Sequence, residues 1–161
     1  NTYEETGAII AAPTTSIPFH PSTGRHDYRY CWLRDSHQIV VTLTSLGATS
    51  AMEPFLRYLS NIVANVYENA EILQAVYGIA LETRLHPREM HRLAGYRSIG
   101  PVCVGTDDYQ KESHDAYGAV ILALAHAFFD ERLTRAGDEV LFRRLEQIGK
   151  EILKRFDKRK H

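Results

Sequence analysis

The stretch DYRYCWLRDS, from Asp27 to Ser36, combines the residue types of a sugar-binding site. It contains the chain's only tryptophan, Trp32, followed closely by Arg34 and Asp35. A sugar ring carries hydroxyl groups on its edges and C–H groups on its faces. An arginine donates hydrogen bonds in a fixed fork, an aspartate accepts them, and an indole ring covers an apolar face. This stretch therefore predicts a site for a polar ring-shaped ligand.

The same residues also have a structural interpretation, which the residue types alone leave open. Arg34 with Asp35, or Arg29 with Asp27, can form ion pairs that only stabilise a helix start, with Trp32 in the core. In either case the apolar-periodic helix that follows holds the stretch at its N-terminal end, where loops and binding sites collect.

The helix after this stretch is predicted from Leu33 onward, with an apolar face of Ile39, Val40, Leu43 and Leu46 that ends at Gly47. A second helix is predicted from Ser50, where the spacing of Ser50 and Glu53 is that of a capping box. Pro54 is expected in its opening turn. Its apolar positions recur every three or four residues: Met52, Phe55, Leu56, Leu59, Ile62, Val63 and Val66.

Two further helices follow a long loop at residues 68–106, in which ILQAVYGI and PVCVG favour short strands. The segment from Ser113 to Arg132 is apolar all round its middle, which predicts a helix surrounded by protein. Either the long loop or something outside the chain is expected to cover it. A fourth helix starts at Gly137 and Asp138, with one apolar stripe: Leu141, Leu145, Ile148, Ile152 and Phe156.

Length and composition predict one domain over residues 1–161, with an extended segment at 1–30 and the four helices and the long loop within 31–161. Within the extended segment, GAIIAA favours a short strand. The chain has 161 residues, a net charge of -1 and a pI near 6.8, which argue against nucleic acid or an anionic membrane as partner. The terminal run KRFDKRKH is interpreted as a solvated last helical turn rather than an interaction tail.

No cofactor, metal or membrane segment is predicted. Cys31 and Cys103 form no CxxC pair and are expected to be reduced thiols. His86 and His91 of HPREMH are five residues apart, which does not fit one helical face, and no third ligand is evident. No apolar run is long enough to span a bilayer, and no signal peptide is evident, so we expect a soluble, cytoplasmic chain. It starts without methionine and stops within a helical pattern, so we expect a piece of a longer protein.

Four separated segments give the chain a resemblance to glycoside hydrolase family 15, the inverting enzymes that include glucoamylases, glucodextranases and bacterial trehalases. They are TGAIIAAPTTSIP, DYRYCWLRDS, LAGYRSIGPVCVG and QKESHDAYG, in the order of the family. The resemblance implies an all-α fold, with helical hairpins that correspond to about the first third of an (α/α)6 toroid. The remainder of the toroid or a second copy of the chain is then the expected protein partner, since two hairpins alone expose apolar edges.

The resemblance implies that Trp32, Arg34 and Asp35 hold the non-reducing glucosyl unit of an α-glucoside or oligosaccharide. Tyr28 is carried over more weakly, since it also suits packing. Tyr96 and Arg97 lie in a family segment that borders the pocket, and Asp115 opens the third helix near it. The segment GRHDY is shorter than the family pattern, so the loop that presents the motif is shortened.

No catalytic residue is predicted in this chain. Inversion requires a carboxylic acid and a carboxylate base about 6.5 to 9.5 Å apart. The family's acid lies in a Trp-Glu segment after the fourth helix and its base lies much later, beyond this sequence. Glu68, Glu71 and Glu112 are the local carboxylates considered instead, and each is interpreted as a surface residue. The predicted function is part of an inverting glucoside hydrolase, and the alternatives are a non-catalytic, oligomeric helical module that binds carbohydrate or protein, or a relative with no retained site.

Overall fold

The computed structural model describes residues 2–17 and 26–158, and it is mainly helical, as predicted. Its helices are α1 (Ser36–Ser45), α2 (Thr49–Asn69), α3 (His114–Phe129) and α4 (Glu139–Lys158). Its strands are β1 (Cys31–Trp32), β2 (Val76–Tyr77), β3 (Arg88–Met90) and β4 (Val102–Val104). β1 pairs with β2 and β3 pairs with β4, both antiparallel. None of the described helices is long and apolar enough to cross a membrane.

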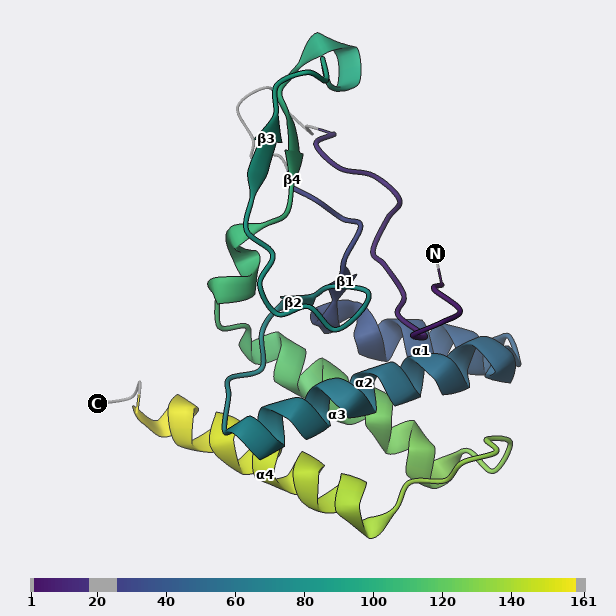
Figure 1. Ribbon diagram of the computed structural model, residues 1–161. Helices are drawn as coiled ribbons and strands as arrows, with labels where there is room; N and C mark the ends of the chain where they lie inside the picture. The colour runs from purple at the N-terminus through teal and green to yellow at the C-terminus, as the bar shows by residue number, and fades with distance from the viewer. Residues whose placement is uncertain (1, 18–25, 159–161) are drawn as a thin grey trace.

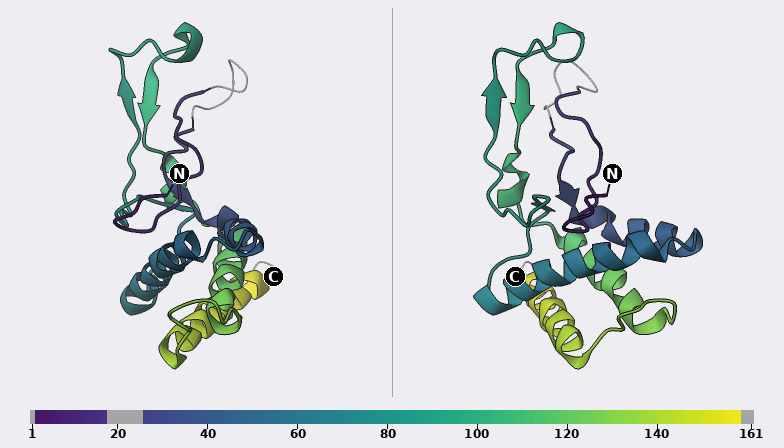
Figure 2. Two further views of the ribbon diagram at one scale, coloured as in Figure 1. Left: turned by 90° about the vertical axis from the view of Figure 1, so that its right-hand side faces the viewer. Right: turned by 45° about the vertical axis from the view of Figure 1, so that its right-hand side comes forward.

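The four helices gather in one half of the molecule, and the β3–β4 hairpin rises away from them (Figure 1). The N-terminal segment runs beside that hairpin, and the small β1–β2 sheet lies where the hairpin meets the helices (Figure 2). α2 and α3 each pack against all three of the other helices, so these two helices form the centre of the helical half. The motif that precedes α1 therefore lies at the junction of the two halves.

Helix α2 follows its predicted apolar stripe, because every residue of that stripe is buried. Tyr58 was missed, and it is also buried, with its hydroxyl donating to the Gly78 carbonyl at 2.6 Å. The predicted capping box is wrong: the N-cap is Ala48 and no side chain caps the helix. Glu53 instead accepts a hydrogen bond from the Thr134 amide of the α3–α4 connection. Pro54 lies inside the helix, one turn later than predicted.

Helix α1 begins three residues later than predicted, after a 3-10 turn, η1 (Leu33–Asp35). The Ser36 hydroxyl donates to the Leu33 carbonyl at 2.6 Å and closes that turn. Gly47, with φ of +67°, follows the helix as predicted. Leu46 lies beyond the last helical residue and is 74% exposed, so it does not belong to the buried face.

Helices α3 and α4 pack on α2, but they leave apolar side chains uncovered. Leu122 is 53% and Phe129 is 80% exposed, so the described residues do not cover α3 on all sides, and the expected cover from outside the chain stays a prediction. The long loop does not cover this side, because its hairpin points away from the helices (Figure 1). The start of α4 is capped by Asp138, whose Oδ1 accepts from the Leu141 amide at 2.8 Å.

The apolar stripe of α4 is buried near the start of the helix and exposed to solvent near its end. Leu141, Leu145 and Ile148 are buried, whereas Phe156 is 51% exposed and lies against His114, with 5.2 Å between the ring centroids. The described part of the basic terminal run continues α4 to Lys158, which fits the interpretation as a last helical turn, and residues 159–161 lie outside the described residues.

The long loop contains the two predicted strands, β2 and β4, and a third that was missed, β3. β3 forms from the HPREMH segment and pairs Arg88 with Val104 and Met90 with Val102. The GAIIAA segment is not a strand, although its Ile9 forms an isolated bridge with Thr2.

Candidate functional site

The stretch around Trp32 is held in place by the β1–β2 pairing and by η1. Trp32 lies opposite Val76, and the Leu33 amide donates to the Ala75 carbonyl at 3.0 Å. Cys31 and Leu33 are fully buried, whereas Trp32 is half-buried and Arg34 is exposed. This alternation directs the apolar residues into the core and leaves Trp32 and Arg34 available at the surface.

Trp32 and Asp35 line one pocket of about 240 Å³. Its other walls are apolar: Ile9, Ile10, Ala11 and Ile39. The N-terminal segment reaches this position because its Ala11 amide donates to the Tyr30 carbonyl at 3.0 Å. These isoleucines were not predicted as site residues, and the only signal for them was the apolar run GAIIAA beside the motif.

The indole of Trp32 has two roles in this arrangement. Part of it packs against a small core cluster of Val76, Leu85 and Tyr109. Its Nε1–H is buried and has no hydrogen-bond partner within the described part of the chain. A buried donor without an acceptor is uncommon in native proteins and calls for an explanation, such as a ligand or an ordered water.

The structure brings Arg34, Asp35 and Asp115 close together, because η1 packs against α3. Arg34 Nε lies 3.4 Å from Asp35 Oδ1, and both side chains are largely exposed. The pKa of Asp115 is lowered chiefly by a hydrogen bond from the Ser113 hydroxyl, with a smaller contribution from the positive charge of Arg34. Two carboxylates and one guanidinium therefore lie at the N-terminal end of α3.

Tyr28 is beside this group, whereas Tyr96 and Arg97 are not. The Tyr28 ring lies 6.1 Å from the Trp32 ring, centroid to centroid, and its side chain is partly exposed. Tyr96 and Arg97 form a 3-10 turn, η2 (Tyr96–Ser98), at the tip of the β3–β4 hairpin, far from the helices (Figure 1). Arg97 lies over the Tyr96 ring, 5.3 Å from its centroid. These two residues are therefore separate from the Trp32 pocket in this chain.

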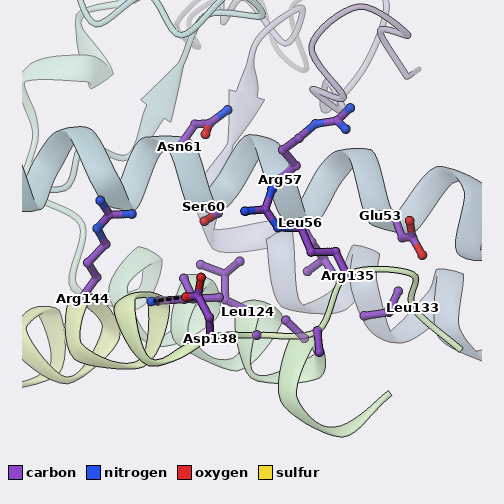
Figure 3. Close-up of a pocket in the computed structure, with 14 residues that line it drawn as sticks. Glu53, Leu56, Arg57, Ser60, Asn61, Leu124, Leu133, Arg135, Asp138 and Arg144 are labelled. Carbon is purple, nitrogen blue, oxygen red and sulfur yellow. Dashed lines mark hydrogen bonds between the residues drawn. The ribbon is translucent and has the colours of Figure 1, made fainter. Parts of the chain in front are cut away.

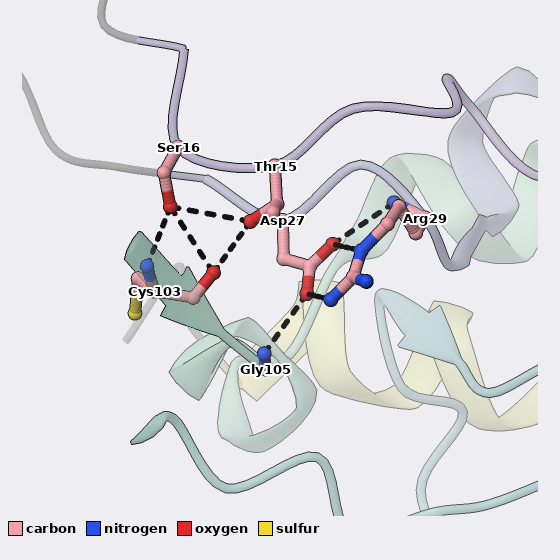
Figure 4. A network of polar contacts seen from close by, with 6 residues as sticks. All are labelled: Thr15, Ser16, Asp27, Arg29, Cys103 and Gly105. Carbon is pink, nitrogen blue, oxygen red and sulfur yellow. Dashed lines mark hydrogen bonds and ion pairs between the residues drawn. The ribbon is translucent and has the colours of Figure 1, made fainter. Parts of the chain in front are cut away.

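Asp27 and Arg29 form a structural ion pair that ties the motif to the hairpin (Figure 4). Both carboxylate oxygens accept from Arg29, at 2.9 and 2.8 Å, and Oδ2 also accepts from the Gly105 amide at 3.0 Å. Burial acts to raise the pKa of Asp27, but the hydrogen bonds from Arg29 and Gly105 outweigh it and the pKa is lowered. Nearby, Thr15 and Ser16 both donate to the Cys103 carbonyl. The contacts of Asp27 and Arg29 thus fit the interpretation in which this ion pair stabilises the fold.

A second pocket, of about 240 Å³, lies between α2, the end of α3 and the start of α4 (Figure 3). Leu56, Leu124 and Leu133 form part of its lining, and Arg135 extends across it toward α2 (Figure 3). Its two carboxylates are already used, since Glu53 bonds the α3–α4 connection and Asp138 caps α4. This pocket is therefore part of a joint between helices.

The described residues hold no group of three metal-ligating side chains. His86 Nδ1 lies 2.8 Å from the Tyr109 hydroxyl, and His91 pairs with Glu89. Cys31 and Cys103 are both thiols with no disulfide between them, and burial raises the pKa of Cys31 to about 12.

The local carboxylates that were considered for catalysis do not line the Trp32 pocket. Glu68 pairs with Arg144 and Glu112 pairs with Arg155, while Glu71 lies in the loop just after α2. Among the described residues of the pocket lining, Asp35 is the one carboxylate.

Comparisons with known proteins bear on the whole chain. A family model described as "Glycosyl hydrolases family 15" matches residues 1–154. The chain is 34% identical over 151 residues to the trehalases of Mycolicibacterium smegmatis and Mycobacterium tuberculosis, which covers 92% of the chain but only 23% and 22% of those proteins. It is 31% identical over 123 residues to the trehalase of Thermoplasma acidophilum, covering 76% of the chain and 20% of that protein. No solved structure matches significantly. The chain thus spans less than a quarter of these relatives.

Proposed function

The chain belongs to glycosyl hydrolases family 15, and on that premise we propose that it is part of an inverting hydrolase of α-glucosides, either an α-glucan or trehalose. In this proposal the chain supplies residues that hold the non-reducing glucosyl unit, while the catalytic acid and base come from other segments. Trehalose is the substrate class that the names of the relatives favour, since all three are called trehalases.

The observation that carries the proposal is the pocket shared by Trp32 and Asp35, with Arg34 paired to Asp35. The partnerless Trp32 Nε1–H needs an acceptor, and a sugar hydroxyl is one. Asp35 accepts from hydroxyl groups, and Arg34 donates to them. The apolar isoleucines of the lining suit the C–H faces of a pyranose ring.

Asp115 and Tyr28 extend this site in the proposal, because both lie near the Trp32 and Arg34 group. Tyr96 and Arg97 would contribute to the glucosyl site only if the tip of the β3–β4 hairpin bordered the pocket in the longer protein. Their position at the hairpin tip, away from Trp32, argues against this contribution. The single carboxylate of the pocket supports a holding role for this chain and no catalytic role.

A toroid that continues beyond these residues is also part of the proposal. Leu122 and Phe129 of α3 and Phe142 of α4 are exposed, and apolar side chains of this size are usually covered by protein. The remainder of an (α/α)6 toroid would cover them, and so would a second copy of the chain. The second possibility keeps open a non-catalytic oligomeric module, which the same exposed residues favour.

Calorimetric titration of the purified chain with glucose, maltose, trehalose and the inhibitor acarbose tests this proposal, with glucose release followed in the same samples. Binding without release is the expected result, and it must be lost in Trp32→Ala and in Asp35→Asn. Absence of binding by the folded wild-type chain would contradict a glucosyl-holding role. Release of glucose by the isolated chain would contradict the assignment of the acid and base to other segments.

A further inference from the structure

A pocket of about 410 Å³ lies between the C-terminal end of α2 and the second half of α4, and it shares no residue with the Trp32 pocket. Its volume lies in the usual range for small-molecule sites. Buried apolar side chains of Val66 and Ile148 and the buried Tyr117 contribute to its lining. This pocket could not be predicted from the sequence, because its residues come from three separate helices and the loop after α2.

The exposed part of this pocket combines an aromatic ring with polar groups. Tyr67 is 47% exposed, and Glu71, Gln147 and Arg155 lie around it in the lining. An aromatic face beside a carboxylate, an amide and a guanidinium is the combination that binds the C–H face and the hydroxyl edge of a sugar. Here it occurs without any contribution from the DYRYCWLRDS motif.

Two hydrogen-bonding groups of the pocket lack partners within the described residues. Arg155 Nη1 bonds Glu112, but Arg155 Nε is buried with no partner. The Tyr117 hydroxyl accepts from the Leu73 amide at 3.1 Å. The Glu71 carboxylate forms no described hydrogen bond or ion pair. The pocket thus offers both donors and an acceptor, which is what a polyhydroxylated ligand requires.

The charged side chains of the lining limit the class of ligand that this pocket can bind. The charged side chains of the lining are Glu71, Glu151 and Arg155, and two of them are already paired: Arg155 with Glu112 at 2.6 Å, and Glu151 with Lys154 at 2.9 Å. A charged ligand would have to compete with these ion pairs, and a neutral ligand would not. A neutral ligand with alternating donors and acceptors fits this balance best.

We propose that the pocket between α2 and α4 is a second carbohydrate-binding site, for a neutral saccharide, separate from the Trp32 pocket. Its existence does not depend on the proposed function, because none of its residues belongs to the glucosyl-holding group. A weak second site of this kind would tether a longer saccharide or a second sugar molecule beside the first site.

Two-dimensional NMR of the 15N-labelled chain, titrated with trehalose and with maltotriose, tests the inference. We expect two groups of amide signals to shift, one around Trp32 and one around Ala70 and Ile148. Tyr67→Ala and the isosteric Glu71→Gln are expected to weaken the second group's binding about tenfold or more while leaving the first group unchanged. Trp32→Ala is expected to do the opposite.

Tyr3→Ala is the matched control, because Tyr3 is 44% exposed and lies in neither pocket. It must leave both groups of shifts unchanged. The inference is overturned if the signals around Ala70 and Ile148 do not move in the folded wild-type chain. It is also overturned if Glu71→Gln and Tyr67→Ala, both folded, bind as the wild type does. If the signals around Ala70 and Ile148 shift and those around Trp32 do not, the proposed function is refuted and the second binding site is supported.

Discussion

The Asp27 carboxylate receives the Arg29 guanidinium through two hydrogen bonds, of 2.9 and 2.8 Å, while its Oδ2 also accepts from the Gly105 amide. Asp27 is completely buried, and Gly105 is distant in sequence. One side chain therefore fixes the segment before β1 to the end of the β3–β4 hairpin.

Asp27→Asn is expected to lower the free energy of unfolding by about 2–3 kcal/mol, because hydrogen bonds to a charged group are lost and the amide cannot reproduce the paired contact. Urea denaturation followed by circular dichroism measures this. Asp35→Asn is the control, since its ion pair is exposed. Equal, small effects in the two variants would contradict a structural role for Asp27.

The lowered pKa of Asp27 also predicts how stability depends on pH. The folded pKa lies below the unfolded value of 3.8, so the stabilisation is fully present above about pH 5 and is lost as pH falls through the folded pKa. The stability difference between wild type and Asp27→Asn should therefore shrink as pH falls below about 4. A difference that stays constant from pH 7 to pH 3 would rule out this linkage.

Gly105→Ala is expected to destabilise the chain by about 1–3 kcal/mol. Gly105 has a φ of +91°, and an added Cβ would lie 2.4 Å from the His86 carbonyl oxygen. Gly118→Ala is the matched control: Gly118 lies within α3 with no atom within 4 Å of an added Cβ, so alanine should stabilise the helix by about 0.5–1 kcal/mol. Thermal unfolding of both variants gives the comparison, and the same sign for both would contradict the prediction.

Ala70→Gly is expected to stabilise the chain by about 1 kcal/mol. Ala70 ends α2 in the left-handed region, with φ of +52°, which costs a non-glycine residue about 1–2 kcal/mol. Ala64→Gly, in the interior of the same helix, should instead cost about 1 kcal/mol. Chemical denaturation of the two variants separates the effects, and destabilisation by Ala70→Gly would show that the conformation at residue 70 is not strained.

Helix α2 was the part of the fold best predicted from sequence, because its apolar residues recur at helical spacing over about four turns and all of them are buried. The start of α2 was predicted less accurately. Ser50 and Glu53 have capping-box spacing, but Glu53 bonds the Thr134 amide, a contact between residues distant in sequence. Local spacing does not reveal when such a distant partner replaces the local one.

The candidate site shows the same division between local and distant contacts. The residues of DYRYCWLRDS identified Trp32 and Asp35, and the structure places both at one pocket. The isoleucines on the opposite wall depend on pairing of the N-terminal segment with the motif, such as that of the Ala11 amide with the Tyr30 carbonyl. Neither residue type nor spacing within the motif encodes that pairing.

Arg34→Ala distinguishes a binding role from a structural one at the site itself. Its ion pair with Asp35 is largely exposed, and such pairs contribute at most about 1 kcal/mol, so unfolding should change little and helix content should stay the same. Sugar binding should be lost, because in the proposed site the guanidinium, which lies beside Asp35 of the pocket, donates to the sugar hydroxyls. Arg143→Ala is the control, since Arg143 forms a comparably exposed pair with Glu139 on α4, outside the pocket. Large destabilisation by Arg34→Ala alone would make the Arg34 and Asp35 pair structural, and retained binding would remove Arg34 from the site.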